Sequence, residues 1–376
     1  MRELFNLAVD LDERFDLRPS ATGDDASCAR IVPSTFADER TLAWIDDEFG
    51  GSWSSEAHAG TNAIAFRDDA PVGFATFDPK GLRFAWLRGI ARERDVGIFG
   101  PFGIASAERG AGLGRRLLRL ALSELRGRGY ARALIPAIGG EQLIRYYREA
   151  VGAQVVERFD GVTWVARRPR VLVMASGSGT NLQAVLDRER DGKLPIEIVA
   201  VVSNQPQAYA LERARAAGVP SVEAVAWSRG EETRGEYDAR LLRTVRAHEP
   251  DLILLLGWMH LLPEHFVRMF PDLVNLHPAF LPLDPERDDV VMPDGTRIAA
   301  FRGANAVRDA LAAGSRWVGA TVHVVTPSTD RGPVLVRKPM RVAQGEAEEH
   351  VMQRLHPMEH AIVATAIMRW IYERKA

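Results

Sequence analysis

The sequence is short of several features, and each shortage argues against a class of protein. It contains one cysteine, Cys28, so an internal disulfide framework cannot form and a reducing cytosol is the expected compartment. Its apolar runs fall short of the roughly 20 residues that a membrane-spanning helix needs, and acidic residues interrupt the apolar N-terminus, so we expect no signal peptide. A formal net charge of -2 provides no general attraction to nucleic acid or to an anionic membrane.

The chain is long enough for two domains. It has 376 residues, of which 46% are hydrophobic and 26% charged, as in globular proteins. A basic stretch with a proline at 167–170 precedes a buried strand that begins at Val171, which indicates a boundary. We therefore predict an N-terminal domain over residues 1–166 and a C-terminal domain over residues 170–376.

The C-terminal half alternates strand-like and helix-like segments, which predicts an α/β fold with a mostly parallel sheet and helices on both faces. The predicted strands are residues 170–176, 196–204, 251–257 and 273–277, with an added pair at 320–326 and 333–342. The predicted helices are residues 181–192, capped by Thr180 or Asn181, and 208–218, 236–250, 262–270 and 347–375.

The N-terminal half predicts a separate α+β domain with a mixed sheet. Residues 35–50 are expected to form a helix, and residues 61–69 and 71–78 flank the turn residues of a hairpin. A strand at 95–106 then leads through a glycine-rich turn into an amphipathic helix at 115–129.

Asn275, His277 and Asp330 form the most informative polar set. Asn275 and His277 end one predicted strand, and Asp330 follows another that contains His323. An amide can hold a developing oxyanion, an imidazole can assist it, and a carboxylate can relay protons. Because α/β folds bind ligands at the carboxyl ends of strands, this set predicts acyl transfer to an amine. A packed role for His323 and a backbone-bonding role for Asn275 remain open.

Two glycine-rich turns lead into helices and are candidates for anion binding. Ser176 to Asn181 has neither a dinucleotide nor a Walker spacing, so a single phosphate monoester fits it better than a dinucleotide. Arg109 to Gly114 has the same physics and can hold a pyrophosphate through backbone N–H groups. Plain strand-to-helix connections are the alternative for both.

Several ordered motifs of the C-terminal half resemble the glycinamide ribonucleotide (GAR) formyltransferase family. These enzymes transfer a formyl group from 10-formyltetrahydrofolate to the amine of GAR in purine synthesis. The motifs are SGSGTNLQAVL, VVSNQPQAYALERARAAGVP, GWMHLLPEHFV, NLHPAFLP, VHVVTPSTDRGPVL and HPMEHAI. The resemblance implies a Rossmann-like sheet, 10-formyltetrahydrofolate as the co-substrate, and chemistry that needs no metal.

The resemblance also implies a role for each matching residue. Asn275 would polarise the formyl oxygen, His277 would stabilise the oxyanion, and Asp330 would orient His277 and shuttle protons. The acceptor would be held by Ser178, Gly179, Thr180, Asn181 and Arg234 at its phosphate and by Glu359 near its amine. The folate pocket would be bordered by Met259, His260, Leu261, Leu262 and Val267. On periodicity alone, the segment from Met259 to Val267 fits a core position better.

One stretch departs from the family pattern. The family continues from Leu-Pro directly into a Lys-aromatic-x-Gly segment, whereas here Leu281-Pro282 is followed by residues 283–300 before the expected continuation at 301–311. Asp294-Gly295 stands between strand-like runs, which predicts a hairpin. This insertion would lie beside the catalytic segment and could act as a lid or change which amine is accepted.

Residues from about 15 to 165 resemble a GCN5-related N-acetyltransferase (GNAT) domain, through IASAERGAGLGRRLLRLAL and QLIRYYREAVGAQVV. The resemblance implies acetyl-CoA as a ligand. Its binding residues would be Arg109, Gly110, Ala111, Gly112, Leu113 and Gly114, with Tyr147 as the acid that protonates the leaving thiolate. A degenerate domain used for packing or regulation is the alternative.

The leading hypothesis is therefore a folate-dependent formyltransferase fused to an acetyltransferase-like domain, with small-molecule partners and no nucleic acid, membrane or metal. A second hypothesis keeps the chemistry and changes the acceptor to another amine or to water, as in a formyltetrahydrofolate hydrolase. A third is a sensor of acetyl-CoA and folate whose N-terminal domain is silent.

Overall fold

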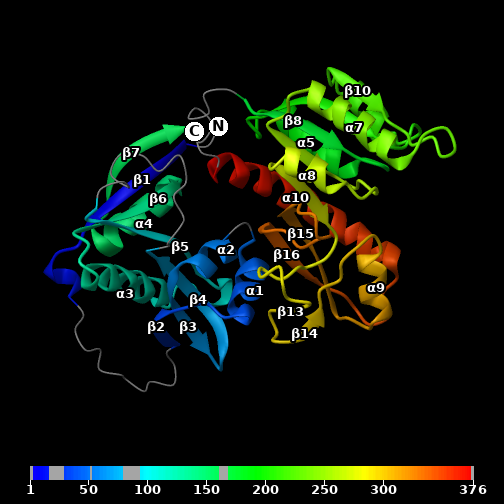
Figure 1. The fold of residues 1–376 in the computed structure, drawn as a ribbon. Coiled ribbons are helices and arrows are strands. Elements are labelled where there is room, and N and C mark those ends of the chain that lie inside the picture. The colour runs from blue at the N-terminus through cyan, green and yellow to red at the C-terminus, as the bar shows by residue number, and fades with distance from the viewer. Residues whose placement is uncertain (1–2, 17–28, 51–52, 79–93, 161–167, 374–376) are drawn as a thin grey trace. The chain divides into compact units, whose positions relative to one another are not determined.

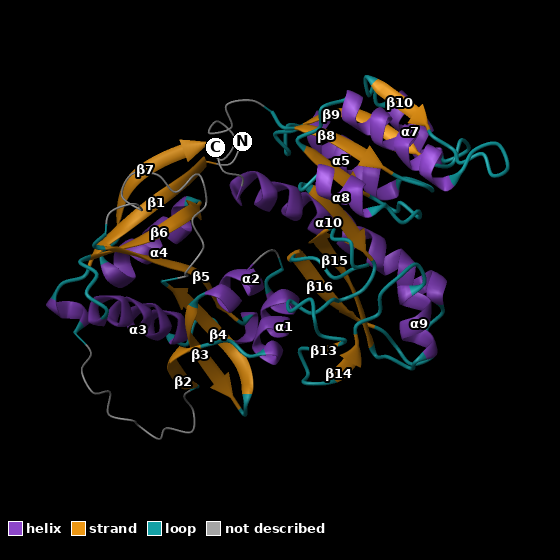
Figure 2. Ribbon diagram, viewed as in Figure 1, coloured by secondary structure: helices purple, strands orange, loops and turns teal. Residues whose placement is uncertain are grey.

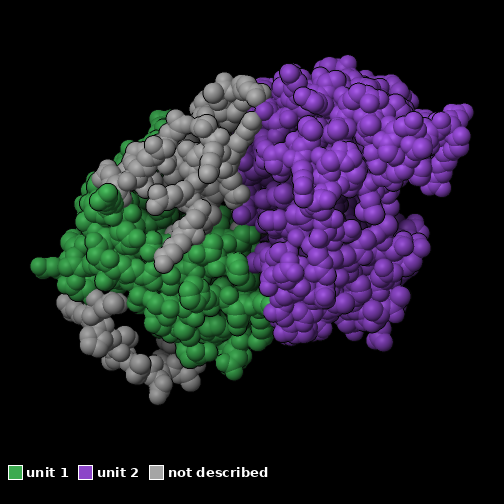
Figure 3. Space-filling view, in the orientation of Figure 1, with its two compact units in different colours: residues 1–49, 53–164, 372–376 green, residues 50–52, 165–371 purple. Residues whose placement is uncertain are grey.

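The chain folds as two compact units, shown in Figure 3. The computed structural model describes residues 3–16, 29–50, 53–78, 94–160 and 168–373, so Cys28 and the predicted boundary residue Arg167 lie outside the described part. Unit 1 is Met1–Phe49, Trp53–Trp164 and Tyr372–Ala376, and unit 2 is Gly50–Ser52 and Val165–Ile371.

Unit 1 contains a mixed seven-stranded sheet in the order β2-β3-β4-β5-β6-β1-β7 (Figure 1). Its strands are β1 (Glu3–Asp10), β2 (Arg30–Thr35), β3 (Thr61–Arg67), β4 (Ala70–Phe77), β5 (Val96–Ile104), β6 (Arg132–Gly139) and β7 (Gln154–Asp160). Its helices are α1 (Glu39–Glu48), α2 (Trp53–Ala59), α3 (Leu113–Gly127) and α4 (Glu141–Val151). The predicted hairpin is present as β3 and β4, which pair antiparallel.

Helix α3 covers this sheet because its apolar residues recur on one face. Leu113, Leu117, Leu118, Leu122 and Leu125 are buried in one cluster with residues of β1, β3, β4 and β5. The spacing follows the 3.6-residue helical period, so the glycine-rich turn before the helix is held against the sheet.

Strand β5 pairs with its two neighbours over different lengths. With β4 it pairs antiparallel from Phe99 to Ile104. With β6 it pairs parallel from Val96 to Ile98. Among the described residues, β5 and β6 therefore diverge beyond Ile98, and the turn at 109–114 follows the diverging end of β5.

Unit 2 contains a second seven-stranded sheet, in the order β10-β9-β8-β11-β12-β15-β16, with helices on both faces (Figure 2). Its strands are β8 (Arg170–Met174), β9 (Glu197–Ser203), β10 (Ser221–Ala224), β11 (Leu252–Leu255), β12 (Leu273–His277), β15 (Trp317–Val324) and β16 (Val334–Arg341). Its helices are α5 (Thr180–Arg190), α6 (Tyr209–Ala216), α7 (Arg234–Ala247), α8 (Glu264–Met269), α9 (Ala306–Ala312) and α10 (Glu348–Glu373).

The central strands of this sheet are buried on both sides. Leu172 and Met174 of β8 pack in one cluster with Tyr237 and Leu241 of α7. Val171 and Val173 alternate with them and are also fully buried, so the opposite face is covered as well. Pairing from β10 through β12 is parallel, and β15 and β16 add antiparallel pairs. The predicted fold class is confirmed.

The insertion forms the predicted hairpin. Its strands are β13 (Asp289–Val291) and β14 (Arg297–Ala299), which pair antiparallel. The turn between them is closed by hydrogen bonds from Gly295 N to Met292 O and from Met292 N to Thr296 O, both 2.8 Å long.

Some predicted boundaries are wrong. Helix α5 begins at Thr180 itself and is preceded by Gly179, which has a φ of +73°, so neither Thr180 nor Asn181 is the cap. A Cβ at position 179 would lie 2.7 Å from the Cα of Ala210, so glycine is required there. Helix α7 begins at Arg234, before the predicted residue 236, because Thr233 and Glu236 form a capping box. Elements β1, β2, β6, β10, α2 and α9 were not predicted as helices or strands.

Among the described helices, none is both long enough and apolar enough to cross a bilayer.

Candidate functional site

Three loops meet at one edge of the sheet of unit 2. Strands β8, β11 and β12 are parallel neighbours, and their pairing places Met174 beside Leu255 and Leu255 beside Asn275. The glycine-rich turn at 176–181, the segment at 257–262 and the residues after Asn275 all continue from this row. Segments that are distant in the sequence therefore meet at one edge.

Asn275, His277, His323 and Asp330 form a compact polar cluster. The Nδ2 atom of Asn275 lies 3.3 Å from Nε2 of His323 and 3.5 Å from Oδ1 of Asp330. The other Asp330 oxygen lies 3.5 Å from Nδ1 of His277. Strand pairing opposes Asn275 to His323, so β12 and β15 fix the cluster. The structure thus brings together the three residues that the sequence analysis assigned to catalysis.

Residues 301–303, which follow the insertion, hold this cluster through the main chain. The carbonyl of Phe301 accepts a hydrogen bond of 2.8 Å from Nε2 of His277. The amide of Gly303 donates to Oδ2 of Asp330 at 2.8 Å. Sequence reasoning missed both contacts, because a backbone group gives no signal in side-chain identity.

Asp330 adopts an uncommon backbone conformation. Its φ is +52°, in the left-handed region, which costs most L-residues roughly 1–2 kcal/mol and is tolerated best by glycine, asparagine and aspartate. The carboxylate is therefore presented from a tight turn that the surrounding contacts must maintain.

The glycine-rich turn leaves the start of α5 without a side-chain cap. Gly179 occupies the cap position with no side chain to bond the first amides of the helix. Ser178 is exposed, and Arg213 binds its carbonyl at 2.8 Å. Ser178, Gly179, Thr180 and Asn181 therefore border a helix N-terminus that suits an anion.

Two amide side chains beside this turn each have one buried polar atom without a partner among the described residues. Asn181 donates to Glu359 at 2.9 Å, which leaves its Oδ1 unpaired. Asn204, which the sequence analysis did not single out, accepts from Ser176 at 2.6 Å and leaves its Nδ2 unpaired. Burial raises the pKa of Glu359, although the hydrogen bond from Asn181 opposes this. Buried polar atoms that lack a partner beside a loop suit the binding of a polar ligand.

The segment after β11 divides into exposed and core residues. Met259 and Leu261 are 60% and 71% exposed, so these large apolar side chains are available to a ligand. Val267 is buried in the core with Trp258, and Leu262 packs against that cluster. His260 bonds the hydroxyl of Tyr237 through Nδ1 at 3.2 Å. Of the residues expected to border the folate, Met259 and Leu261 are therefore exposed, whereas Val267 belongs to the core beneath them.

Arg234 contacts the 257–262 segment rather than the glycine-rich turn. Its Nη2 donates to the carbonyl of Leu261, and its Nε pairs with Asp238 at 2.8 Å. The guanidinium lies 5.5 Å from the ring centre of Trp227, on which Arg229 also stacks at 4.8 Å. These contacts group Arg234 with the expected folate residues, apart from the phosphate loop to which it was assigned.

In unit 1, the second glycine-rich turn has a similar geometry. Gly110 and Gly112 have φ values of +87° and +79°, and Gly112 precedes α3 without a side-chain cap. Leu113 is buried, whereas Arg109, Ala111 and Gly112 are exposed, and Gly114 is half-buried. The backbone amides at the start of α3 can therefore face a ligand.

The two tyrosines of α4 differ in position. Tyr147 is 5% exposed and packs in the core beside Phe99, and burial raises its pKa. Tyr146 is half-buried, and its hydroxyl lies 3.2 Å from the position that a Cβ on Gly114 would occupy. The hydroxyl beside the glycine-rich turn is therefore that of Tyr146, not that of Tyr147.

Comparison with known proteins assigns both halves. Residues 169–367 match the family model described as formyl transferase. The chain belongs to the formyl transferase family. Residues 26–153 of this formyl transferase match the model of the acetyltransferase (GNAT) family. Both resemblances predicted from the sequence are confirmed.

Relatives of the formyl transferase half include enzymes of known name. The phosphoribosylglycinamide formyltransferase of Escherichia coli K12 is 33% identical over 198 residues, which cover 52% of this chain and 84% of that protein. The trifunctional purine biosynthetic protein adenosine-3 of Drosophila melanogaster is 37% identical over 197 residues, which cover 52% of this chain but 13% of that protein. The solved glycinamide ribonucleotide transformylase 1 of Symbiobacterium toebii is 35% identical, covering 54% of this chain and 87% of that chain, with a TM-score of 0.47.

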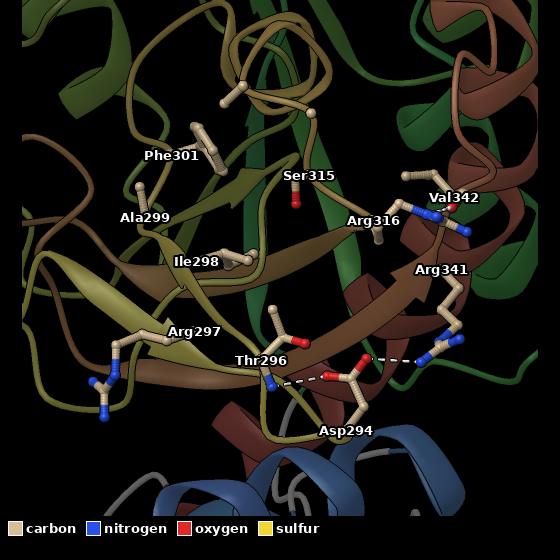
Figure 4. Close-up of a pocket in the computed structure, with 12 residues that line it drawn as sticks. Asp294, Thr296, Arg297, Ile298, Ala299, Phe301, Ser315, Arg316, Arg341 and Val342 are labelled. Atoms are coloured by element: carbon tan, nitrogen blue, oxygen red, sulfur yellow. Dashed lines mark hydrogen bonds and ion pairs between the residues drawn. The ribbon is translucent and has the colours of Figure 1, made fainter.

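The insertion of this formyl transferase borders a cavity of about 590 Å³, drawn in Figure 4. The lining comes from the hairpin turn, β14 and Phe301, from the α9–β15 connection and from residues 341–342 at the end of β16. Asp294 accepts hydrogen bonds from Thr296 N at 2.9 Å, Trp317 Nε1 at 2.9 Å and Arg341 Nη2 at 2.7 Å. These bonds fix the tip of the hairpin to β15 and β16, which favours a fixed strap over a lid.

Charge in the polar cluster of Asn275, His277, His323 and Asp330 is determined by burial and hydrogen bonding. Burial alone would raise the pKa of Asp330, but the hydrogen bond from His323, the charge of His277 and the amide of Gly303 lower it to about 2. Burial lowers the pKa of His277, and the charge of Asp330 only partly opposes this. At neutral pH the cluster therefore contains a carboxylate beside a neutral imidazole.

We predict that the ring of His277 titrates below the ordinary value of 6.5, and at a still lower pH in Asp330→Asn, because the mutation removes the charge that favours the imidazolium. Histidine ring NMR over a pH series, with His277→Asn to assign the signal, measures both values. An upward shift in the mutant would contradict this electrostatic description. Asparagine tolerates a positive φ, so the turn is expected to survive the substitution.

Proposed function

We propose that this protein transfers the formyl group of 10-formyltetrahydrofolate to the amine of GAR. The observation that carries the proposal is the cluster of Asn275, His277 and Asp330 at the sheet edge where the glycine-rich turn and the 257–262 segment also end. The relatives named as phosphoribosylglycinamide formyltransferases support this acceptor.

The cluster suits addition and elimination at a formyl carbon. As the acceptor nitrogen bonds to this carbon, the carbonyl electron pair moves to oxygen, and Asn275 donates an N–H to that oxyanion. His277 donates a hydrogen bond from Nε2 to Phe301 O, so Nδ1 of the neutral ring has a lone pair beside Asp330. The proton lost by the nucleophile passes through this pair to N10 of the folate as the carbon–N10 bond breaks. The products are a formamide and tetrahydrofolate.

In this proposal the acceptor would contact the glycine-rich turn with its phosphate and α10 with its amine side. A phosphate would accept from the uncapped amides at the start of α5 and from the hydroxyls of Ser178 and Thr180. The Nδ2 of Asn204, which has no partner in the part of the chain that the structure describes, offers another donor beside the turn. Glu359, held by Asn181, would receive the polar amine side of the acceptor.

We predict release of tetrahydrofolate from 10-formyltetrahydrofolate that depends on GAR. In Asp330→Asn the turnover number should fall by a factor on the order of 10³ or more, because the amide cannot relay the proton. A steady-state assay with and without GAR measures both.

The control is the far-UV circular dichroism spectrum of Asp330→Asn at the assay temperature, which should match that of the unmodified protein because asparagine tolerates the same backbone conformation. Release without GAR would instead indicate a hydrolase. Unchanged turnover in the mutant would remove Asp330 from the mechanism.

Arg234 serves the folate in this proposal, in place of the role at the acceptor phosphate that the sequence suggested. Folate ends in glutamate carboxylates, and the guanidinium groups of Arg229 and Arg234 on Trp227 lie at the end of the 257–262 segment. The exposed side chains of Met259 and Leu261 would contact the apolar part of the same ligand. In this arrangement the guanidinium groups would bind the glutamate carboxylates of the folate, and the apolar side chains would contact its ring system.

Arg234→Ala should raise the KM for 10-formyltetrahydrofolate by roughly tenfold and leave the KM for GAR unchanged, since one charge-assisted contact is lost. Arg268→Ala, at an exposed arginine paired with Glu264 on α8, is the matched control. A rise in the KM for GAR would return Arg234 to the phosphate site.

For unit 1, we propose acetyl-CoA as the ligand, bound with its pyrophosphate on the amides of residues 109–114. The divergence of β5 from β6 beside this turn supports the proposal, because it leaves main-chain groups of β5 unpaired with β6. Tyr146 is the better placed acid for a leaving thiolate, because its hydroxyl lies beside the turn.

Tyr146→Phe should slow the release of CoA to amine acceptors by a factor on the order of 10² and leave acetyl-CoA binding unchanged. Tyr147→Phe is the matched control and should alter neither quantity. A thiol-release assay over a panel of primary amines, with calorimetric binding, separates the two. Binding without turnover in the unmodified protein would support the sensor hypothesis for this unit.

A further inference from the structure

The segment that returns from the insertion contacts both titratable groups of the proposed reaction. Phe301 O accepts from His277, and Gly303 N donates to the carboxylate of Asp330. Between them, Arg302 donates from Nε to the main-chain oxygen of Asp330 at 3.2 Å. Three consecutive residues therefore fix the positions of the His277 ring, the Asp330 carboxylate and the Asp330 main chain.

Arg302 is anchored at its other end by the insertion itself. Its side chain is 14% exposed, and its Nη1 pairs with Asp288 at 3.0 Å. Its Nη2 donates to the carbonyl of Arg287 at 2.7 Å. Asp288 also pairs with Arg331, the residue after Asp330, and Arg331 donates to Pro285 O at 2.9 Å. The turn around Asp330 is thus tied to the base of the insertion from both sides.

The contacts of Arg302 stabilise the uncommon backbone conformation of Asp330. A φ of +52° persists in a non-glycine residue when neighbouring contacts hold it. Arg302 bonds the oxygen of that same residue, and a planar guanidinium fixes direction as well as distance. Asp294 pins the far end of the hairpin to Trp317 and Arg341, so the insertion is fixed at its tip and at its base.

We propose that the insertion positions the groups of the formyl-transfer site. Its main positioning residue is Arg302, which keeps Asp330 and His277 in the correct place relative to each other. The proposal rests on the proposed function, in which these two groups carry the proton. Arg302 acts through them, since it contacts the main chain of Asp330 and not the side chains of Asn275 or His277.

The test compares Arg302→Met with Arg297→Met. Arg297 is an arginine of the same insertion that pairs with Asp289, so its loss removes a similar charge away from Asp330. We expect Arg302→Met to lower kcat on the order of 10²-fold with little change in either KM, because small misplacement of reacting groups costs about that much. Arg297→Met should keep kcat. Arg302→Lys keeps the positive charge and should therefore recover part of the lost kcat. Recovery should be incomplete, because an ammonium cannot make the same set of directed bonds.

Histidine ring NMR supplies a readout that does not depend on the acceptor. In the unmodified protein the His277 signal should report the tautomer with the proton on Nε2, bonded to Phe301 O. In Arg302→Met the signal should broaden or shift toward a mixture, while Arg297→Met keeps it. If the unmodified protein shows no activity with GAR, the proposed acceptor fails, and the NMR comparison still decides the role of Arg302.

A second variant keeps the proposal testable if Arg302→Met does not fold. Asp288 is 77% exposed, so Asp288→Asn removes the charge from one of the two anchors of Arg302 without disturbing a core. It should give a smaller kcat loss of the same kind. The proposal is overturned if kcat and the His277 signal of both Arg302→Lys and Asp288→Asn equal those of Arg297→Met, or if their effect is confined to KM.

Discussion

Parallel pairing of β8, β11 and β12 is the constraint on which the site of unit 2 depends. It places Met174, Leu255 and Asn275 in one row, so the three loops that follow them begin at the same edge. The pairing is maintained because these strands are buried on both faces, which fixes their register. Antiparallel β15 then brings His323 opposite Asn275, and the turn after it brings Asp330. The chemistry proposed here follows from this register.

Much of this arrangement could be predicted from the sequence, because apolar runs and helical periods determine the strands and helices around the site. The order of motifs also predicts a site made of Asn275, His277 and Asp330, which the fold brings together. Contacts made by the main chain could not be predicted, so Phe301 and Gly303 were missed. The neighbours of Arg234 could not be predicted for a related reason. Its assignment came from motif order, whereas its contact with Leu261 depends on how α7 packs beside the segment after β11.

In unit 1, the sequence could not distinguish between two adjacent tyrosines of α4. Tyr146 and Tyr147 are adjacent in the chain, but successive residues of a helix point about 100° apart, so one faces the core and the other the glycine-rich turn. Spacing to the following glycine could not separate them. Strands β2 and β10, partly exposed and without long apolar runs, were missed because they lack the pattern that identifies the central strands.

The contact between Asp294 and Trp317 gives the molecule a built-in optical reporter. The indole N–H of Trp317 bonds the carboxylate at the tip of the insertion, and the guanidinium of Arg341 lies 4.9 Å over its ring. Indole emission responds to nearby charge and to water, and this ring is 2% exposed. Detachment of the hairpin would hydrate the ring and shift its spectrum to the red. The difference spectrum between the unmodified protein and Trp317→Phe separates this signal from the emission of the other seven of the eight tryptophans. It reports the state of a segment that contacts the polar cluster from a residue outside that cluster.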